Sequence, residues 1–180
     1  YTEGASDSWA YGTPASPKIN KAASGTKAWK TNLSGNYNPL ELSYLYSPCF
    51  DVSSLKYPKF RFAIAHDIED CGIVLCDGAA LQYSTDGVVW QRLNDSTQSA
   101  NWYTDTSYNI WTGERTDWHS VSVKLPKGLQ TVRFRYIFFS DQGSEKEGLA
   151  VDDVEIFDDI PVPAVDNLIG ISPNPTRDGK

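Results

Sequence analysis

The chain has no methionine and only two histidines and three cysteines in 180 residues. The missing methionine predicts a piece cut from a longer precursor. No stretch of about 18 apolar residues occurs, so no segment is predicted to span a membrane. A signal peptide is also lacking, and we expect any such leader to lie upstream of Tyr1.

Basic residues are fewer than acidic residues. Sixteen Lys and Arg stand against 23 Asp and Glu, which gives a formal net charge of −7. This charge would repel a phosphate backbone, so nucleic acid is not an expected partner. Cations, including Ca²⁺, would be attracted to the protein.

Catalytic groups are scarce. The two histidines, His66 and His119, lie in no motif that sets a base beside a nucleophile. The sequence has no G-x-S-x-G, H-E-x-x-H or phosphate-binding loop motif. Nothing marks out one carboxylate pair for glycoside hydrolysis among the 23 acids. We therefore expect a protein that is not an enzyme, with His66 in the core and His119 on a surface strand.

Aromatic residues are abundant, at 13%, and short segments alternate apolar and polar residues without helical periodicity. Clusters of Gly, Pro, Asn, Asp and Ser separate these segments, and Asp86-Gly87 is typical of a hairpin turn. We predict eight strands, at residues 27–31, 43–47, 59–67, 79–84, 88–93, 118–125, 131–139 and 148–157. This pattern predicts an all-β fold, an antiparallel β-sandwich with jelly-roll topology, preceded by an extended lead-in of about 25 residues.

A polar stretch at residues 94–117 carries four aromatic residues, Trp102, Tyr103, Tyr108 and Trp111. Aromatic rings stack on sugar faces and also dominate the contacts between proteins. We predict that these four residues bind a ligand. The alternative is that some of them fold back over the sandwich as a lid.

The strand at residues 131–139 has two arginines, Arg133 and Arg135, that alternate with Phe134 and Tyr136. This alternation places both arginines on the outward face of the sheet. There they could meet an acidic ligand or acidic neighbours in their own sheet. Trp90 lies in the middle of a predicted strand and is expected in the core.

Acidic residues gather at positions 67–70, at position 77 and at positions 152–153. Ca²⁺ takes six to eight oxygen ligands, and strand ends that are distant in sequence can meet at one rim of a jelly roll. The predicted metal ligands are Asp67, Glu69, Asp77, Asp152 and Asp153. The alternative is a solvated loop at 67–70 and a turn capped by residues 152–153.

Cys71 and Cys76 lie in one short segment, C-G-I-V-L-C, where a local disulfide is plausible in an oxidising compartment. The alternative is three reduced thiols. Cys49 is expected to be a small buried hydrophobe.

Four segments carry a resemblance to a known family. They are S-W-A-Y-G-T-P at 8–14, S-G-T-K-A-W at 24–29, Y-S-T-D-G-V-V-W at 83–90 and G-L-A-V-D-D-V-E-I at 148–156. Together they resemble the MAM-like jelly-roll modules of bacterial surface proteins, including the cleaved-adhesin domains of gingipain-type proteases. The resemblance covers about residues 8–157. It implies a secreted, non-catalytic, calcium-stabilised module that serves adhesion or polysaccharide binding.

The chain end carries a second resemblance. After an Asp/Pro-rich linker, I-S-P-N-P-T at 171–176 resembles the start of a C-terminal sorting domain of type IX secretion. The alternative is an ordinary Pro-rich linker. We therefore divide the chain into a jelly-roll module at 1–158, then a linker and truncated sorting domain at 159–180. The insertion at 71–76 departs from the family pattern.

The function expected from these observations is that of an accessory module of a secreted or cell-surface protein. Its expected partner is a polysaccharide or a surface protein, and its expected cofactor is structural calcium. One alternative is a spacer in a secreted protease or glycoside hydrolase, with no ligand of its own. Another is a fragment of an enzyme whose catalytic domain lies upstream.

Overall fold

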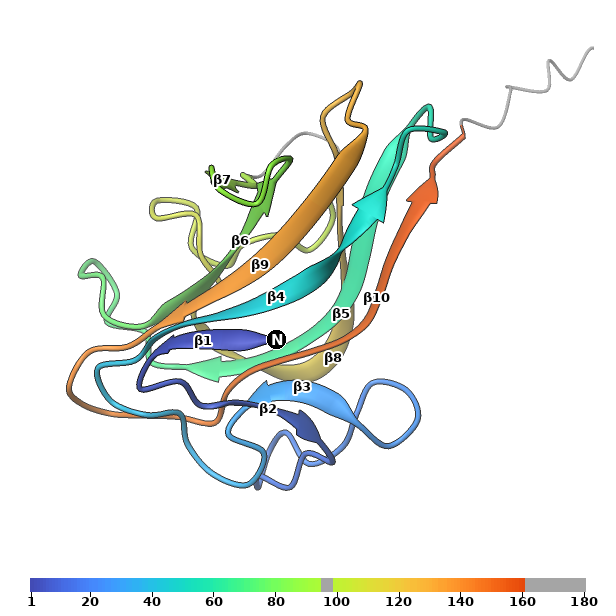
Figure 1. Ribbon diagram of the computed structural model, residues 1–180. Helices are drawn as coiled ribbons and strands as arrows, with labels where there is room; N and C mark the ends of the chain where they lie inside the picture. Colours follow the sequence, from blue (N-terminus) through green and yellow to red (C-terminus); the bar gives the residue numbers. More distant parts are fainter. Residues whose placement is uncertain (95–98, 161–180) are drawn as a thin grey trace, which may run out of the picture.

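The computed structural model describes residues 1–94 and 99–160 of the chain. Within this part, ten strands form two five-stranded antiparallel sheets, and no helix occurs. The strands, as labelled in Figure 1, are β1 (Thr2–Ala5), β2 (Trp9–Gly12), β3 (Ala28–Thr31), β4 (Leu42–Asp51), β5 (Pro58–Ile68), β6 (Gly78–Ser84), β7 (Gln91–Arg92), β8 (Gly113–Lys124), β9 (Thr131–Phe139) and β10 (Gly148–Asp158). None of the described residues forms a helix that could cross a membrane.

The strand order identifies the topology. Sheet A runs β1-β4-β9-β6-β7 and sheet B runs β2-β3-β10-β5-β8. Without β1 and β2, each sheet has four strands in the order of a jelly roll built from two Greek keys. The predicted fold class, an antiparallel β-sandwich with jelly-roll topology, is confirmed. The lead-in supplies β1 and β2, which each add one strand to the edge of a sheet.

The core lies between the two sheets and is rich in aromatic rings. Alternate residues of β9 point inward, so Phe134, Tyr136 and Phe138 are buried while Arg133 and Arg135 face outward. Phe62 of β5 lies at the centre, with its ring centroid 5.8 Å from that of Trp111 and 5.2 Å from that of Tyr136. Edge-to-face contacts of this kind join the two sheets.

Several strands differ from their predicted extents, and β4 runs to Asp51, four residues past its predicted end. The strand predicted at 88–93 is reduced to β7, because the Asp86 carboxylate accepts hydrogen bonds from the backbone N–H groups of Val88 and Val89. These bonds hold residues 86–89 in a side-chain-stabilised turn instead of a ladder. In contrast, β8 begins at Gly113, five residues before the predicted start, and pairs with β5 along most of its length.

Both sheets contain an irregularity beside their exposed edges. The register of β4 against β9 shifts between Tyr46 and Cys49, and that of β10 against β5 shifts between Asp152 and Glu155. A bulge re-aims the side chains around it. This is why Cys49 is exposed, contrary to its expected burial.

We predict that Phe62→Ala lowers the free energy of unfolding by about 3–5 kcal/mol, because it leaves a cavity between the sheets. Urea denaturation measures this change. The matched control is Val88→Ala, at a side chain 80% exposed, which should alter stability by less than about 0.5 kcal/mol. A loss below 1 kcal/mol for Phe62→Ala would contradict the central position of this ring.

Candidate functional site

Three of the four predicted ligand-binding aromatics are buried. Trp102, Tyr103 and Trp111 are 6%, 7% and 0% exposed, and their ring centroids lie 4.6–5.3 Å apart. The Tyr103 hydroxyl donates to the Leu93 carbonyl and accepts from the backbone N–H of Leu81. No ring face of these three residues is open to a ligand, which corrects the expectation for them.

The path of the chain explains this burial. Ala100 pairs with Ser122 of β8 in sheet B, and Trp111 pairs with Ala79 of β6 in sheet A. The chain after Ala100 thus passes from the edge of one sheet to the edge of the other. Its rings fill the gap between the sheets on that side, as the alternative of a lid anticipated.

Tyr108 is the exception, because it is 41% exposed. Its hydroxyl donates to the carbonyl of Ile73, in the loop closed by a disulfide between Cys71 and Cys76. The tip of this loop exposes Ile73 and Val74. A single tyrosine beside an aliphatic loop does not form the aromatic platform that was predicted.

The predicted metal ligands separate into different places. Glu69 and Asp77 lie together, and Asp141, which sequence reasoning did not select, joins them. One carboxylate oxygen of each residue lies within 4.8 Å of the other two. The signal that could have found Asp141 is its position just after β9, at the same rim of the jelly roll.

This acidic cluster is held by hydrogen bonds from its own rim. Tyr37 donates its hydroxyl to Asp77 and accepts from the backbone N–H of Glu69, and the backbone N–H of Asp141 donates to Asp77 at 2.7 Å. Burial raises the pKa of the Asp77 carboxyl, and the charges of Asp141 and Glu69 raise it further. A bound cation would relieve this repulsion, so the donor set suits a hard metal ion.

The other three predicted ligands have different partners. Asp67 is 5% exposed and forms an ion pair with Lys18 at 3.1 Å. Asp152 accepts from the backbone N–H groups of Ala23 and Ser24, at the bulge of β10. Asp153 accepts a hydrogen bond from the Ser24 hydroxyl. These contacts fix neighbouring segments, and residues 152–153 do not join the acidic cluster.

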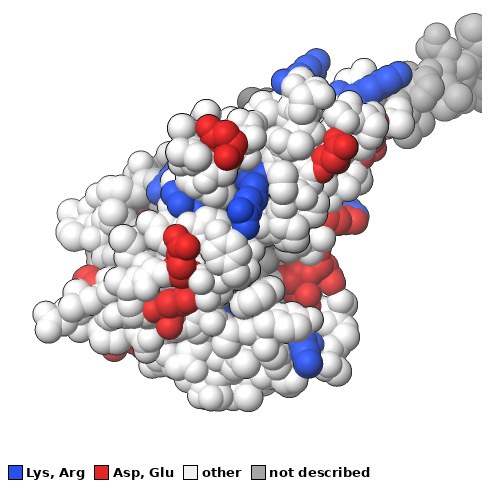
Figure 2. All heavy atoms as spheres, in the orientation of Figure 1, with Lys and Arg blue, Asp and Glu red and all other residues white. Residues whose placement is uncertain are grey.

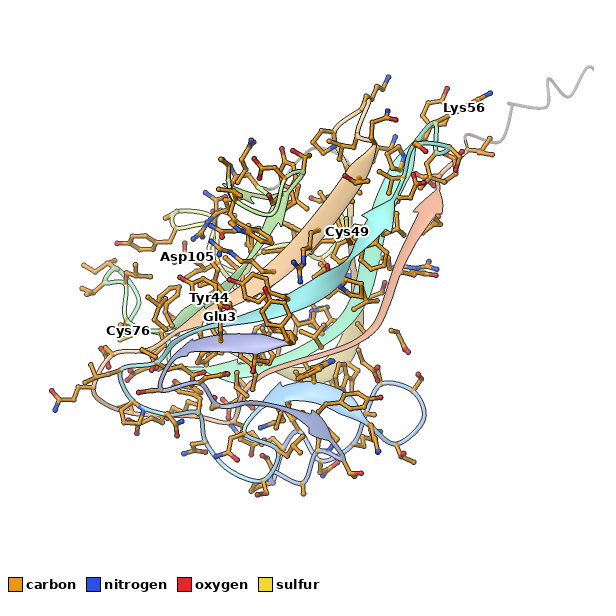
Figure 3. The ribbon with its side chains drawn as sticks, in the orientation of Figure 1. Glu3, Tyr44, Cys49, Lys56, Cys76 and Asp105 are labelled. Atoms are coloured by element: carbon orange, nitrogen blue, oxygen red, sulfur yellow. A yellow bond between two sulfur atoms is a disulfide. The ribbon has the colours of Figure 1, made fainter. Side chains whose placement is uncertain are left out.

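A different set of aromatic residues covers the outer surface of sheet A. We define the arginine–aromatic face as Tyr1, Tyr44, Tyr46, Trp90, Arg133 and Arg135. Figure 3 labels Tyr44, which projects from β4 near Glu3 of β1. Tyr1 is 59% exposed, and Tyr44, Trp90 and both arginines are half-buried. Tyr46 is buried beneath the stacked ring of Tyr1.

Cation–π contacts organise the arginine–aromatic face. The guanidinium carbon of Arg135 lies 4.4 Å from the ring centroid of Trp90 and 4.5 Å from that of Tyr44. That of Arg133 lies 5.1 Å from the ring centroid of Tyr1 and 5.6 Å from that of Tyr46. Half-buried cations over ring faces are held more firmly than exposed ones.

Strand register explains why these residues meet. Tyr46 of β4 lies directly opposite Arg135 of β9, which in turn lies opposite Gln82 of β6. Directly opposed residues share one face of a sheet, so all three point outward. Trp90, expected in the core, instead packs on this face, because the turn at Asp86 folds it back over Arg135.

The two histidines offer no catalytic pair. His66 is fully buried, and its Nδ1 donates to the Gly113 carbonyl at 3.0 Å. Burial lowers its pKa to about 4, so the ring is neutral near pH 7. His119, half-buried, lies with its ring centroid 6.1 Å from that of His66, and burial lowers its pKa as well.

Comparisons with known proteins support the fold. A family model described as Reelin subrepeat B matches residues 30–157. The carbohydrate-binding module TmCBM61, solved in complex with β-1,4-galactotriose, is 10% identical, with a TM-score of 0.53 over 88% of this chain and 87% of that one. The K2 cleaved adhesin domain of Lys-gingipain is 16% identical, with a TM-score of 0.52 over 87% of this chain and 88% of that one. No curated protein matches the chain. At these identities, the two structures establish a shared β-sandwich fold.

We predict that His66 makes the fold sensitive to acid. Its pKa is about 4 when folded and about 6.5 when unfolded, so the unfolded state binds the proton first as the pH falls. The contribution of His66 to the free energy of unfolding is therefore full above pH 6.5 and is lost between about pH 6.5 and 4. Lowering the pH from 7 to 4.5 should therefore reduce the free energy of unfolding by about 2 kcal/mol through this group.

The measurement is urea denaturation at both pH values, for the wild type and for His66→Phe. The variant should show a smaller loss on acidification, whatever its stability at pH 7. Equal losses in the two proteins would mean that His66 does not titrate as its burial requires.

Proposed function

The chain belongs to the Reelin subrepeat B family, and on that premise we propose that it is a non-catalytic, carbohydrate-binding module of a secreted or cell-surface multidomain protein. The observation that carries this proposal is the arginine–aromatic face. It offers several ring faces and hydrogen-bonding groups on one side of a β-sandwich. Sugars bind to proteins through these two kinds of contact.

The position of this face suits an extended glycan. The face crosses sheet A from β1 through β4 to β9, with Trp90 beside it. Four of its six residues, Tyr44, Tyr46, Arg133 and Arg135, lie on strands, which hold side chains more rigidly than loops do. The shared fold with a carbohydrate-binding module solved with a galactan trisaccharide supports the same choice of ligand class. The adhesin domain of similar fold supports a location at the cell surface.

The absence of a catalytic role is part of the proposal. Its support is the burial and neutrality of His66 and the lack of a nucleophile beside either histidine in the described part of the chain. Export by a type IX signal belongs to the same proposal. Residues 171–176, which carry that resemblance, lie outside the described residues.

Calcium is the proposed structural cofactor, bound by Glu69, Asp77 and Asp141. Carboxylate oxygens are the ligands that Ca²⁺ prefers, and these three converge from the loops just after β5, just before β6 and just after β9. A cation here would fasten three chain segments at one rim. Asp67, Asp152 and Asp153 are left out because they lie outside this cluster.

We predict that Trp90→Ala and Tyr44→Ala each weaken glycan binding roughly tenfold, the loss of one stacking ring. A glycan array identifies the ligand, and calorimetry with that ligand measures the affinity. The matched control is Tyr11→Ala, because Tyr11 is 57% exposed on β2 of the other sheet and should leave affinity unchanged. No binding to any glycan would favour the spacer, and equal losses in all three variants would place the site elsewhere.

We also predict that Ca²⁺ raises the thermal midpoint by about 5 °C when it is well above its dissociation constant. Addition of EDTA should reverse the shift. Glu69→Gln and Asp141→Asn should abolish it, whereas Asp117→Asn, at an exposed position on β8, should retain it. A midpoint that is the same with Ca²⁺ and with EDTA would argue against a structural ion.

A further inference from the structure

We infer that the arginine–aromatic face selects glycans that carry anionic groups, either uronic acid carboxylates or sulfate esters. This inference rests on the proposed function and specifies its ligand class. Its basis is a contrast between the protein as a whole, with a net charge of −7, and the two arginines at the centre of this face. Figure 2 shows basic side chains in the middle of the face, with acidic side chains on either side.

Neither arginine is neutralised by a carboxylate. Among the described residues, the ion pairs are made by Lys18, Lys59 and Arg61, and none involves Arg133 or Arg135. In an acidic protein, basic side chains readily find acidic partners. Two half-buried guanidinium groups that have none can provide charge for a ligand.

Most of their hydrogen-bonding capacity is also unused. A guanidinium group has five N–H donors. Arg133 donates through Nε to the Ser47 carbonyl, and Arg135 donates through Nε to Gln82 and through one terminal nitrogen to the Tyr46 hydroxyl. The terminal nitrogens of Arg133 donate to nothing in residues 1–94 and 99–160. A planar fork of this kind matches a carboxylate or a sulfate.

The two groups are already positioned for a ligand. The bonds through Nε fix the direction of each side chain, and rings on both sides restrict its movement. Arg133 and Arg135 are two residues apart on one strand, so their Cα atoms lie roughly 7 Å apart on the same face. Two anionic groups of one glycan chain can therefore be bound together, with a sugar ring over Trp90.

The surroundings favour a discrete anionic group over a dense polyanion. Glu3 accepts a hydrogen bond from the Tyr46 hydroxyl at 3.0 Å, close to Arg135. This carboxylate and the negative net charge repel a phosphate backbone as a whole. An isolated carboxylate or sulfate between neutral hydroxyls meets the arginines without that penalty. The face therefore combines charge recognition with stacking.

The test compares matched pairs of oligosaccharides by calorimetry at 20 mM salt. The first pair is trigalacturonic acid and its methyl ester, and the second is a carrageenan tetrasaccharide and its desulfated form. We expect the anionic member of at least one pair to bind about tenfold more tightly than its neutral partner, which is the effect of one charge-assisted contact. The preferred pair identifies the anionic group. Raising the salt to 500 mM should weaken this preference, because the part of each charge that faces solvent is then screened.

Variants locate the effect. Arg133→Gln and Arg135→Gln should each reduce the preference for the anionic form by about tenfold, and Arg135→Lys should restore part of it, because the charge remains but the fork is lost. Arg61→Gln is the matched control, since this arginine lies on β5 of sheet B, paired with Glu155, and should leave the preference unchanged. Circular dichroism of each variant checks that it is folded.

The outcomes separate this inference from the proposed function. Equal binding of the anionic and neutral forms in both pairs overturns the inference and leaves a carbohydrate-binding module. A preference that survives both Arg→Gln substitutions also overturns it. Failure of every glycan to bind, on the array and in calorimetry, overturns the proposed function and the inference together.

Discussion

The rim of the jelly roll that carries Glu69, Asp77 and Asp141 depends on the buried ammonium group of Lys30. The side chain is fully buried, and its Nζ lies 2.5–3.4 Å from the carbonyl oxygens of Thr31, Asn32, Gly35 and Glu147, which share its three N–H donors. Burial lowers its pKa to about 8, so the group is still charged at pH 7. A buried charge without partners costs several kcal/mol. The loop after β3 and the start of β10 must therefore close around it.

This closure builds the rim that carries the acidic cluster. The Glu147 carboxylate accepts from the backbone N–H groups of Lys18 and Ile19, which ties the N-terminal segment to β10. The backbone N–H of Tyr37 donates to the Lys146 carbonyl, and its hydroxyl then reaches Asp77. The convergence of carboxylates thus follows from a lysine far from them in sequence. One fixed cation and one proposed Ca²⁺ would stabilise the same end of the sandwich.

The arginine–aromatic face depends on a different feature, the packed core beneath sheet A. Each inward ring of β9 fixes the position of its outward neighbours, so Phe134 and Tyr136 in the core hold the adjacent Arg133 and Arg135 in place. In loops, strand alternation does not decide which side chains are buried. Trp102 and Trp111 were expected to face a ligand, yet they close the gap between the sheets. An aromatic ring in a loop packs against apolar surface that would otherwise be exposed to water.

The sequence by itself determined the all-β fold, the alternation of inward and outward residues along β9, and the outward position of Arg133 and Arg135. Side-chain alternation is a local property of the pleated strand, so it can be read from neighbouring residues. Tertiary structure alone decided that Trp90 covers Arg135, that Asp141 joins Glu69 and Asp77, and that Asp152 belongs to a bulge. These outcomes depend on strand register and on the path of loops between sheets. Both are set by contacts between residues far apart in the chain, which no local pattern encodes.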